Sequence, residues 1–293
     1  MTICLRPSFP TRHPNNNNFL HIQRSHGFSS LLLPLPTLAK SPKHAFIAAS
    51  AMSELSSPTA QPNGPVREVA STARVRVFSA AEDPEGAKQC IVTIGQGFAS
   101  EPNNDFYCAD ASLHGSRWQA IASNTLLRSP PHVRLLHSVA GGGPEGEHAA
   151  VAFAYSYPED KAPEGDPDPP GTIDLSTSTR PESIPVRDEM LSYLSAKKAE
   201  FHETHGSFGY IAFLATRPEW RGRGLGSRLL RHLTDKADAA GRWCYLEATN
   251  EDNARLYQRH GFRTIETKVW TLECLPGRRV MLLPMSRPPS RSP

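Results

Sequence analysis

The sequence of 293 residues lacks the features that mark several common protein classes. Its five cysteines are odd in number and widely spaced, and no Cys-x-x-Cys pair is present, which argues against a zinc site and a disulfide framework. No apolar run approaches the roughly 20 residues that a membrane-spanning helix needs. Because 32 basic residues nearly balance 29 acidic ones, no basic face for nucleic acid is indicated. We therefore expect no metal, no membrane contact and no nucleic-acid partner.

Acidic residues are missing from residues 1–53, which carry five Arg or Lys side chains and many Ser, Pro and Asn. That composition is typical of an organellar transit peptide, and the lack of an Arg-rich amphipathic helix favours a plastid over a mitochondrion. Two alternatives stay open, namely a disordered leader or translation that begins at Met52, and both fit a cytoplasmic protein. Residues 54–72 have the composition of a linker, and residues 289–293 that of a disordered tail.

Hydrophobic periodicity predicts one folded domain over residues 73–288. The predicted strands cover residues 74–78, 133–139, 149–157, 210–216, 243–248, 263–271 and 278–285. The predicted helices cover residues 85–99, 113–128, 185–204, 225–237 and 251–260, and Asp83-Pro84 is a start signal for the first. Strands that alternate with helices and end in a hairpin-like pair indicate a mixed α/β sheet. Residues 158–182, rich in Pro, Asp, Glu and Gly, are predicted to form an exposed loop.

The strongest chemical signal follows the strand at 210–216 and opens the next helix. It reads Arg217-Pro218-Glu219-Trp220-Arg221-Gly222-Arg223-Gly224-Leu225-Gly226-Ser227. Alternating glycines let backbone N–H groups crowd around an anion, and the helix start adds unpaired N–H donors and the positive end of its dipole. Arg221 and Arg223 add full charges, so the segment is a candidate diphosphate site. Its spacing fits neither a P-loop nor a dinucleotide-binding turn. The alternative is a tight surface turn that binds no ligand.

This segment resembles the coenzyme A signature of the GNAT superfamily of N-acetyltransferases, an Arg or Gln followed by Gly-x-Gly-x-Gly or Ala. The match is Arg221-Gly222-Arg223-Gly224-Leu225-Gly226. A second segment is similar to the family's short helix ending in Tyr-x-x-x-Gly-Phe, here Tyr257-Gln258-Arg259-His260-Gly261-Phe262. The resemblance covers residues 74–288 and is strongest over 208–263. Within the superfamily, Leu246-Glu247-Ala248-Thr249 looks similar to puromycin N-acetyltransferase-like proteins.

The resemblance implies an acyl-CoA N-acyltransferase fold, with a mostly antiparallel central sheet flanked by helices, and acetyl-CoA as the acyl donor. In that fold the strand at 210–216 splays away from the strand at 243–248, and the thioester lies in the gap. The implied contacts with the donor are Leu214, Ala215, Thr216, Arg221, Gly222, Arg223, Gly224, Leu225, Gly226, Ser227 and Asn253.

Two side chains are candidates for the proton transfers. The resemblance implies that Tyr257, which shares a helix face with Asn253, protonates the departing thiolate, whereas a core aromatic is the alternative. Glu247 lies on the strand that borders the gap, and it is the candidate base for the acceptor amine. Glu247 is alternatively a solvated strand residue or a group that binds the acceptor's cation.

The sequence leaves the acceptor open, and we expect a small-molecule or protein amine that attacks directly in a ternary complex. The helices over 85–128 and 185–204 and the loop 158–182 are expected to contact it; the loop's acidic residues either attract a cationic amine or form a solvated face. Two rival functions remain. One is a catalytically inert coenzyme A-binding or interaction module, and the other is nucleic-acid binding through arginines, which the near-neutral charge disfavours. No feature indicates an oligomeric state.

Overall fold

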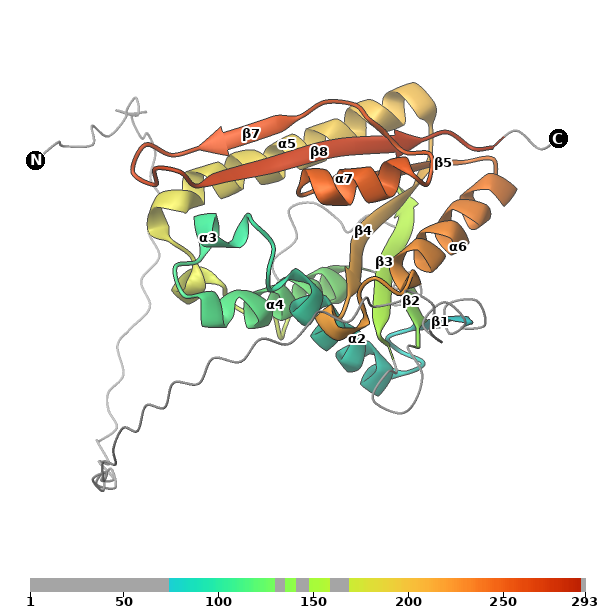
Figure 1. Ribbon diagram of the computed structural model, residues 1–293, viewed down its shortest axis with the longest axis horizontal. Coiled ribbons are helices and arrows are strands. Elements are labelled where there is room, and N and C mark those ends of the chain that lie inside the picture. The colour runs from blue at the N-terminus through green and yellow to red at the C-terminus, as the bar shows by residue number, and fades with distance from the viewer. Residues whose placement is uncertain (1–73, 130–134, 141–147, 159–168, 291–293) are drawn as a thin grey trace, which may run out of the picture. The chain divides into compact units, whose positions relative to one another are not determined.

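An eight-stranded sheet runs through the part of the chain that the computed structural model describes, which is residues 74–129, 135–140, 148–158 and 169–290 (Figure 1). These residues fall within one compact unit, residues 60–293. The predicted leader and linker, 1–53 and 54–72, lie outside the described residues. Residues 159–168 of the predicted loop and 291–293 of the predicted tail do so as well.

The strands of the sheet follow the order β1-β2-β3-β4-β5-β8-β6, and β7 pairs with β8. Their bounds are Val75–Ser79 (β1), Leu135–Val139 (β2), Ala150–Tyr157 (β3), Phe208–Thr216 (β4), Trp243–Ala248 (β5), Arg263–Thr264 (β6), Lys268–Thr271 (β7) and Arg279–Arg287 (β8). Every paired neighbour is antiparallel except β4 and β5, which run parallel. The expected mixed, mostly antiparallel sheet is therefore confirmed.

Helices cover both faces of the sheet. Their bounds are Pro84–Phe98 (α2), Asn104–Tyr107 (α3), His114–Arg128 (α4), Ile184–His205 (α5), Leu225–Ala239 (α6) and Glu251–Gln258 (α7). Leu229 and Leu230 of α6 are fully buried in a cluster with side chains of β4, β5 and β8. In other clusters, Ile94 of α2 and Leu126 of α4 pack with side chains of β2, β3 and β4, and Phe201 of α5 packs with aromatic residues of β4 and β5.

One predicted strand, over 263–271, is divided into β6 and β7. Between them, the Ile265 N–H donates to the carbonyl of Pro284 on β8 at 2.8 Å. Pro284 has no N–H to donate back, so the ladder of hydrogen bonds is interrupted opposite it. The pairing then resumes with a register shifted by one residue.

An irregularity in β4 opens the sheet at its centre. The register of β4 on β3 skips Ala212, because Phe213 and Ile211 lie opposite consecutive residues of β3. An extra residue of this kind is a β-bulge, which bends the strand and increases its twist. Parallel pairing with β5 is confined to residues 208–210 of β4. The two strands therefore separate beyond the bulge, as the resemblance implied.

Candidate active site

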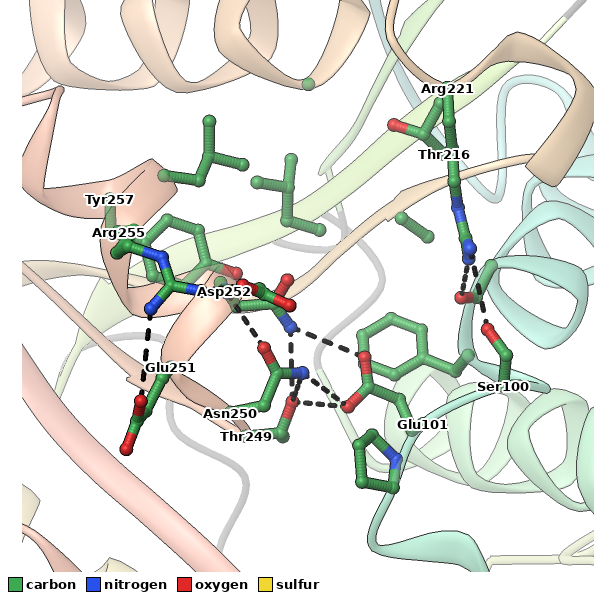
Figure 2. A pocket seen from close by; sticks show the side chains of 18 of the residues that line it. Ser100, Glu101, Thr216, Arg221, Thr249, Asn250, Glu251, Asp252, Arg255 and Tyr257 are labelled. Atoms are coloured by element: carbon green, nitrogen blue, oxygen red, sulfur yellow. Dashed lines mark hydrogen bonds and ion pairs between the residues drawn. The ribbon is translucent and has the colours of Figure 1, made fainter.

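A cleft of about 1020 Å³ lies where β4 leaves β5 (Figure 2). Its walls come from the turn before α6, the start of α7, the segment between α2 and α3, and the turn between β7 and β8. Most of the residues that the sequence predicted for the donor and the general acid line it: Leu214, Ala215, Thr216, Arg221, Gly222, Gly224, Leu225, Gly226, Ser227, Asn253 and Tyr257. Two predicted residues, Arg223 and Glu247, are not among the lining residues.

The N-terminus of α6 presents backbone donors to this cleft. Gly224 is the N-cap residue in the left-handed conformation (φ 78°, ψ 7°), and no side chain caps the helix. The first intrahelical bond runs from the Arg228 N–H to the Gly224 carbonyl at 3.0 Å. The N–H groups of the first helical turn, residues 225–227, consequently have no intrahelical acceptor. With the helix dipole behind them, they form a site that favours an anion.

The two arginines of the glycine turn are oriented differently from each other. The Arg221 guanidinium donates to the Gly97 carbonyl at 2.6 Å and ties the turn to α2. Arg223 instead stacks over the ring of Trp220, with its guanidinium carbon 4.4 Å from the ring centroid. In this structure Arg223 therefore lies on the outside of the turn, and Arg221 donates two hydrogen bonds to the protein itself, to the Gly97 carbonyl and to Ser100 Oγ.

The open edge of β4 supplies a second set of backbone groups. The Arg217 N–H donates to the carbonyl of Ala149, its neighbour on β3, at 3.0 Å. Hydrogen-bonded pairs alternate along an antiparallel ladder, so Ala215 is also bonded to β3. The backbone groups of Leu214 and Thr216 consequently face the side from which β5 has departed. The expectation of free backbone groups thus applies to Leu214 and Thr216, and Ala215 is corrected to a bonded position.

Tyr257 and Asn253 both line the cleft from α7, and Figure 2 shows Tyr257. The side chain of Tyr257 belongs to the core cluster beneath α6 and is only 8% exposed. Burial raises the pKa of the Tyr257 hydroxyl, and the nearby carboxylate of Glu101 raises it further. The phenol is therefore protonated at neutral pH, which is the state that a proton donor requires.

A carboxylate that the sequence did not single out lies beside these two residues. Glu101, in the segment after α2, accepts hydrogen bonds from Thr249 Oγ1 at 2.6 Å, Asn250 Nδ2 at 3.1 Å and Asn253 Nδ2 at 3.3 Å (Figure 2). These bonds join the segment after α2 to the start of α7 across the cleft. No local motif marks Glu101, because its partners lie about 150 residues further along the chain.

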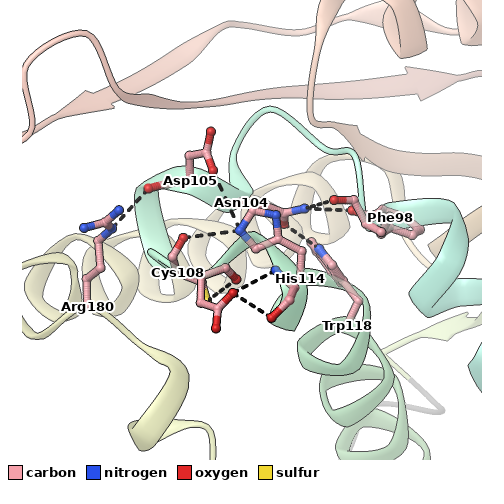
Figure 3. A network of polar contacts seen from close by, with 10 residues as sticks. Phe98, Asn104, Asp105, Cys108, His114, Trp118 and Arg180 are labelled. Carbon is pink, nitrogen blue, oxygen red and sulfur yellow. Dashed lines mark hydrogen bonds and ion pairs between the residues drawn. The ribbon is translucent and has the colours of Figure 1, made fainter. Parts of the chain in front are cut away.

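The segment that carries Glu101 is held in place by a network of polar contacts (Figure 3). Asn104 Nδ2 donates to the carbonyls of Phe98 and Ala99 at 2.8 and 3.1 Å, and these are carbonyls at the end of α2 that lack intrahelical donors. The same side chain accepts a bond from Trp118 Nε1 at 2.7 Å. A buried His114 ring adds a contact of 3.2 Å with the carbonyl of Cys108. Residues 98–108 are thus fixed on α4.

Glu247 lies on β5 beneath α5. Its carboxylate accepts a hydrogen bond from the Tyr210 hydroxyl at 2.9 Å and lies 3.8 Å from Lys198 Nζ of α5. Burial raises the pKa of Glu247, whereas the Lys198 charge lowers it. The arrangement makes Glu247 part of a buried network that joins α5 to the sheet, away from the residues that line the cleft.

Other candidates are placed away from the cleft. Residues of α5 and the described part of the loop, 169–182, do not line it, although both were expected to contact the acceptor. Burial raises the pKa of the Cys244 thiol to about 12, so this cysteine is not a nucleophile at neutral pH. Within the described residues, no group of three or more His, Cys, Asp or Glu side chains is arranged to hold a metal ion. No described helix is both long and apolar enough to span a bilayer.

Comparisons with known proteins agree with this architecture. The profile of the Acetyltransferase (GNAT) family matches residues 151–262. A solved structure named as an arylalkylamine N-acetyltransferase 7 from the mosquito Aedes aegypti is similar with 18% identity and a TM-score of 0.50, over 73% of this chain and 87% of the other. A search of curated proteins found no match.

Two further solved structures are similar to the chain with lower TM-scores. One is described as histone acetyltransferase HPA2 and related acetyltransferase from Corynebacterium glutamicum (18% identity, TM-score 0.46, 75% of this chain and 98% of the other). The other is arylalkylamine N-acetyltransferase 2 from Aedes aegypti (16% identity, TM-score 0.46, 75% and 100%). The family profile spans β3 to α7 and includes the glycine turn, so this part of the chain is similar to the Acetyltransferase (GNAT) family.

Proposed function

We propose that this protein transfers an acetyl group from acetyl-CoA to the primary amine of a small molecule or a protein, by direct attack in a ternary complex. The observation that carries the proposal is the convergence, in one cleft, of an uncapped helix N-terminus, the open edge of β4 and the hydroxyl-bearing residue Tyr257. These are a site for a diphosphate, a site for an extended chain, and a proton donor.

The residues present fit the donor in two respects. The N–H groups of residues 225–227 match the diphosphate of coenzyme A, because they are unpaired and lie at the positive end of a helix dipole. Leu214 and Thr216 offer backbone donors and acceptors that match the amide groups of its pantetheine arm. When bound, acetyl-CoA supplies a thioester, which is an acyl group already activated towards an amine.

The chain's own groups then handle charge and protons. A backbone N–H on the open edge of β4 donates to the acetyl carbonyl and stabilises the oxyanion that forms as the amine nitrogen attacks. Tyr257 gives its proton to the thiolate as the carbon–sulfur bond breaks. Glu101 accepts the proton that the nitrogen loses. Transfer of that proton back to the Tyr257 phenolate restores both residues, so the net products are an N-acetyl amine and a free thiol.

Glu101 is preferred over Glu247 as the proton acceptor because of where each carboxylate lies. Glu101 lines the cleft and adds to the field at Tyr257. Glu247 is 8% exposed at its side chain and is engaged by Tyr210 and Lys198. We retain Glu247 as a structural carboxylate whose charge stabilises the position of α5.

The donor site is tested by replacing Gly224 with Val. A β-branched residue is strained at positive φ by at least about 1–2 kcal/mol, and relief of that strain would rotate the peptide groups that open α6. Gly241, just after α6, has φ 63° and nothing within 4 Å of an added Cβ, so Gly241→Val is a matched control for strain alone. We expect acetyl-CoA affinity, measured by titration calorimetry, to fall at least about tenfold in Gly224→Val and to stay within about twofold in the control.

Turnover separates the proposed enzyme from an inert coenzyme A-binding module. Thiol release from acetyl-CoA is followed with polyamines, amino acids, aminoglycosides and peptide N-termini as acceptors. Binding of acetyl-CoA without thiol release for any amine would favour the inert module. Unchanged affinity in Gly224→Val would remove the helix N-terminus as the diphosphate site.

We also propose that residues 1–53 direct the protein to a plastid. The support is their composition alone, which is free of acidic residues. A fluorescent protein fused to residues 1–53 should accumulate in plastids and be shortened there, and uniform cytoplasmic fluorescence would refute the proposal.

A further inference from the structure

Four arginines that line the cleft have no role in the proposed chemistry, namely Arg255, Arg259, Arg278 and Arg279, and the last two are adjacent in the sequence. Arg278 is the last residue of the turn between β7 and β8, and Arg279 is the first residue of β8; both are exposed and line the cleft. Neither guanidinium makes a hydrogen bond or an ion pair with any part of the chain that the structure describes. Two adjacent cations without partners, in a cleft that binds charged molecules, are a site for an anionic group.

The position of this turn separates it from the donor's diphosphate. In Figure 1 the β7–β8 turn and the start of α6 lie on opposite sides of α7. The diphosphate is assigned to the start of α6, where residues 225–227 offer their N–H groups. Arg278 and Arg279 line the cleft from the β7–β8 turn, whereas Tyr257 lines it from α7.

The segment that carries Glu101 is fixed against the strand that follows these arginines. The side chain of Asn103 donates to the Met281 carbonyl and accepts from the Met281 N–H, both at 3.2 Å. Asn103 lies two residues after Glu101, and Met281 lies two residues after Arg279. The segment that carries the Glu101 carboxylate and the segment that carries the two guanidinium groups are thus neighbours, joined by these two hydrogen bonds, and all three side chains belong to residues that line the cleft.

The acidic side chains nearby do not neutralise the arginines. Glu101 is occupied by Thr249, Asn250 and Asn253. Asp105, which also lines the cleft, points towards His114, with 3.8 Å between Oδ1 and Nε2 (Figure 3). Within the described residues, no carboxylate pairs with Arg278 or Arg279, so the cleft lining carries charges of both signs, as a ligand that carries both signs requires.

We infer that the acceptor bears an anionic group in addition to its amine, held by Arg278 and Arg279 while the amine faces Glu101. A carboxylate or a phosphonate fits, because guanidinium groups bind both in a bidentate manner. Amino acids are the simplest such acceptors. This inference rests on the proposed acetyl transfer and specifies its substrate class.

The test compares acceptors that differ only in the anionic group. Amino acids, aminoalkylphosphonates and amines of equal length without an anionic group are assayed for thiol release from acetyl-CoA. We expect kcat/KM to be roughly ten- to a hundredfold higher for the anionic members, the value of one charge-assisted contact. The carboxylate and phosphonate series then show which anion is preferred.

The double variant Arg278→Ala/Arg279→Ala should raise KM for anionic acceptors by a similar factor. It should leave unchanged both the KM for amines without an anionic group and the affinity for acetyl-CoA. Arg263→Ala is the matched control, since Arg263 is exposed on β6 and does not line the cleft. Equal losses for charged and uncharged acceptors, or weaker acetyl-CoA binding, would overturn the inference. A wild-type protein that acetylates no amine would instead refute the proposed function, and the inference with it.

Discussion

Replacing Glu101 with Gln tests the assignment of the proton acceptor with the smallest change of shape. The substitution removes the negative charge and keeps a planar group of the same size. The remaining carbonyl can still accept from Thr249, but the new amide meets the donor Asn253, which now bonds Glu101 at 3.3 Å. Loss of that one hydrogen bond should cost about 1 kcal/mol of folding stability.

The expected effect on catalysis is larger than the effect on stability. Removing a general base typically lowers the rate by about 10²–10⁴-fold, which is about 3–5 kcal/mol of transition-state stabilisation. The loss should appear in kcat, because the amine still binds. Tm, measured by calorimetry, should fall by only a few degrees, about 2–4 °C per kcal/mol for a domain of this size.

Glu247→Gln is the matched comparison, since both residues are glutamates within the same domain. Glu247 is buried, so the substitution disturbs its pairing with Lys198 and Tyr210 and should lower Tm more than Glu101→Gln does. At a temperature where both variants are folded, kcat should stay within about threefold of wild type. The opposite pattern, with a normal kcat in Glu101→Gln and a large loss in Glu247→Gln, would refute the assignment and restore Glu247 as the base.

Three other perturbations follow from the structure. Tyr257→Phe removes only the hydroxyl from a ring packed in the core, so turnover should fall about 100-fold and acetyl-CoA affinity, by calorimetry, less than tenfold. Burial lowers the pKa of His137 to about 3, below its unfolded value of about 6.5. The free energy of unfolding should therefore fall as pH drops below about 6.5, by about 2 kcal/mol at pH 5. In His137→Leu, the free energy of unfolding measured with urea should depend less on pH between pH 8 and 5. Hydrogen bonds from Arg287 lower the pKa of Asp238 to about 2. The stabilisation by this carboxylate is therefore full above about pH 4 and is lost as pH falls towards 2. In the same urea unfolding assay, Asp238→Asn should lose about 1–2 kcal/mol of unfolding free energy at neutral pH and should show no such loss in acid.

Elements with a local signal were predictable from the sequence. The start of α2 is an example, since the Asp83 carboxylate accepts from the Gly86 N–H at 2.8 Å, as the Asp-Pro signal indicated. The strand β5 has the predicted bounds, 243–248, because an apolar run there is limited by turn residues. The division at 265–267 was not predictable, because it depends on Pro284 of another strand. Neither was α3, whose four residues are too few for a helical period.

The same distinction applies to the site. The glycine turn and α7 were recognisable because each is a continuous motif, and the structure brings both to one cleft. The orientation of Arg223 was not, since it depends on the ring of Trp220. Glu247 was chosen from its place on a strand that borders the gap, and strand alternation alone does not show that α5 covers that side chain. The finer similarity to puromycin N-acetyltransferase-like proteins stays a prediction.

The convergence of the two motifs has a topological cause. In the sheet, β4 and β5 are the only paired neighbours that run parallel within the described residues, so their carboxyl ends lie at the same edge. The glycine turn follows β4, and the Thr249–Asn253 segment follows β5. Ligands of α/β sheets bind outside the carboxyl ends of such strands. A bulge at Ala212 separates the two strands just before these ends, which turns an edge into a cleft.

The acceptor side has a different origin. Glu101 and the β7–β8 turn come from parts of the chain that precede β2 and follow α7. Glu101 is joined to this edge by its bonds to Thr249, Asn250 and Asn253, and the strand after the turn is joined to the Glu101 segment through Asn103 and Met281. The donor motifs are thus fixed by the connections of two neighbouring strands, whereas the acceptor wall depends on long-range packing. Segments that follow strand ends and carry few core side chains can change sequence without loss of the fold. For this reason the donor half of the cleft is recognisable from sequence motifs. The acceptor is selected by residues that no local sequence pattern marks.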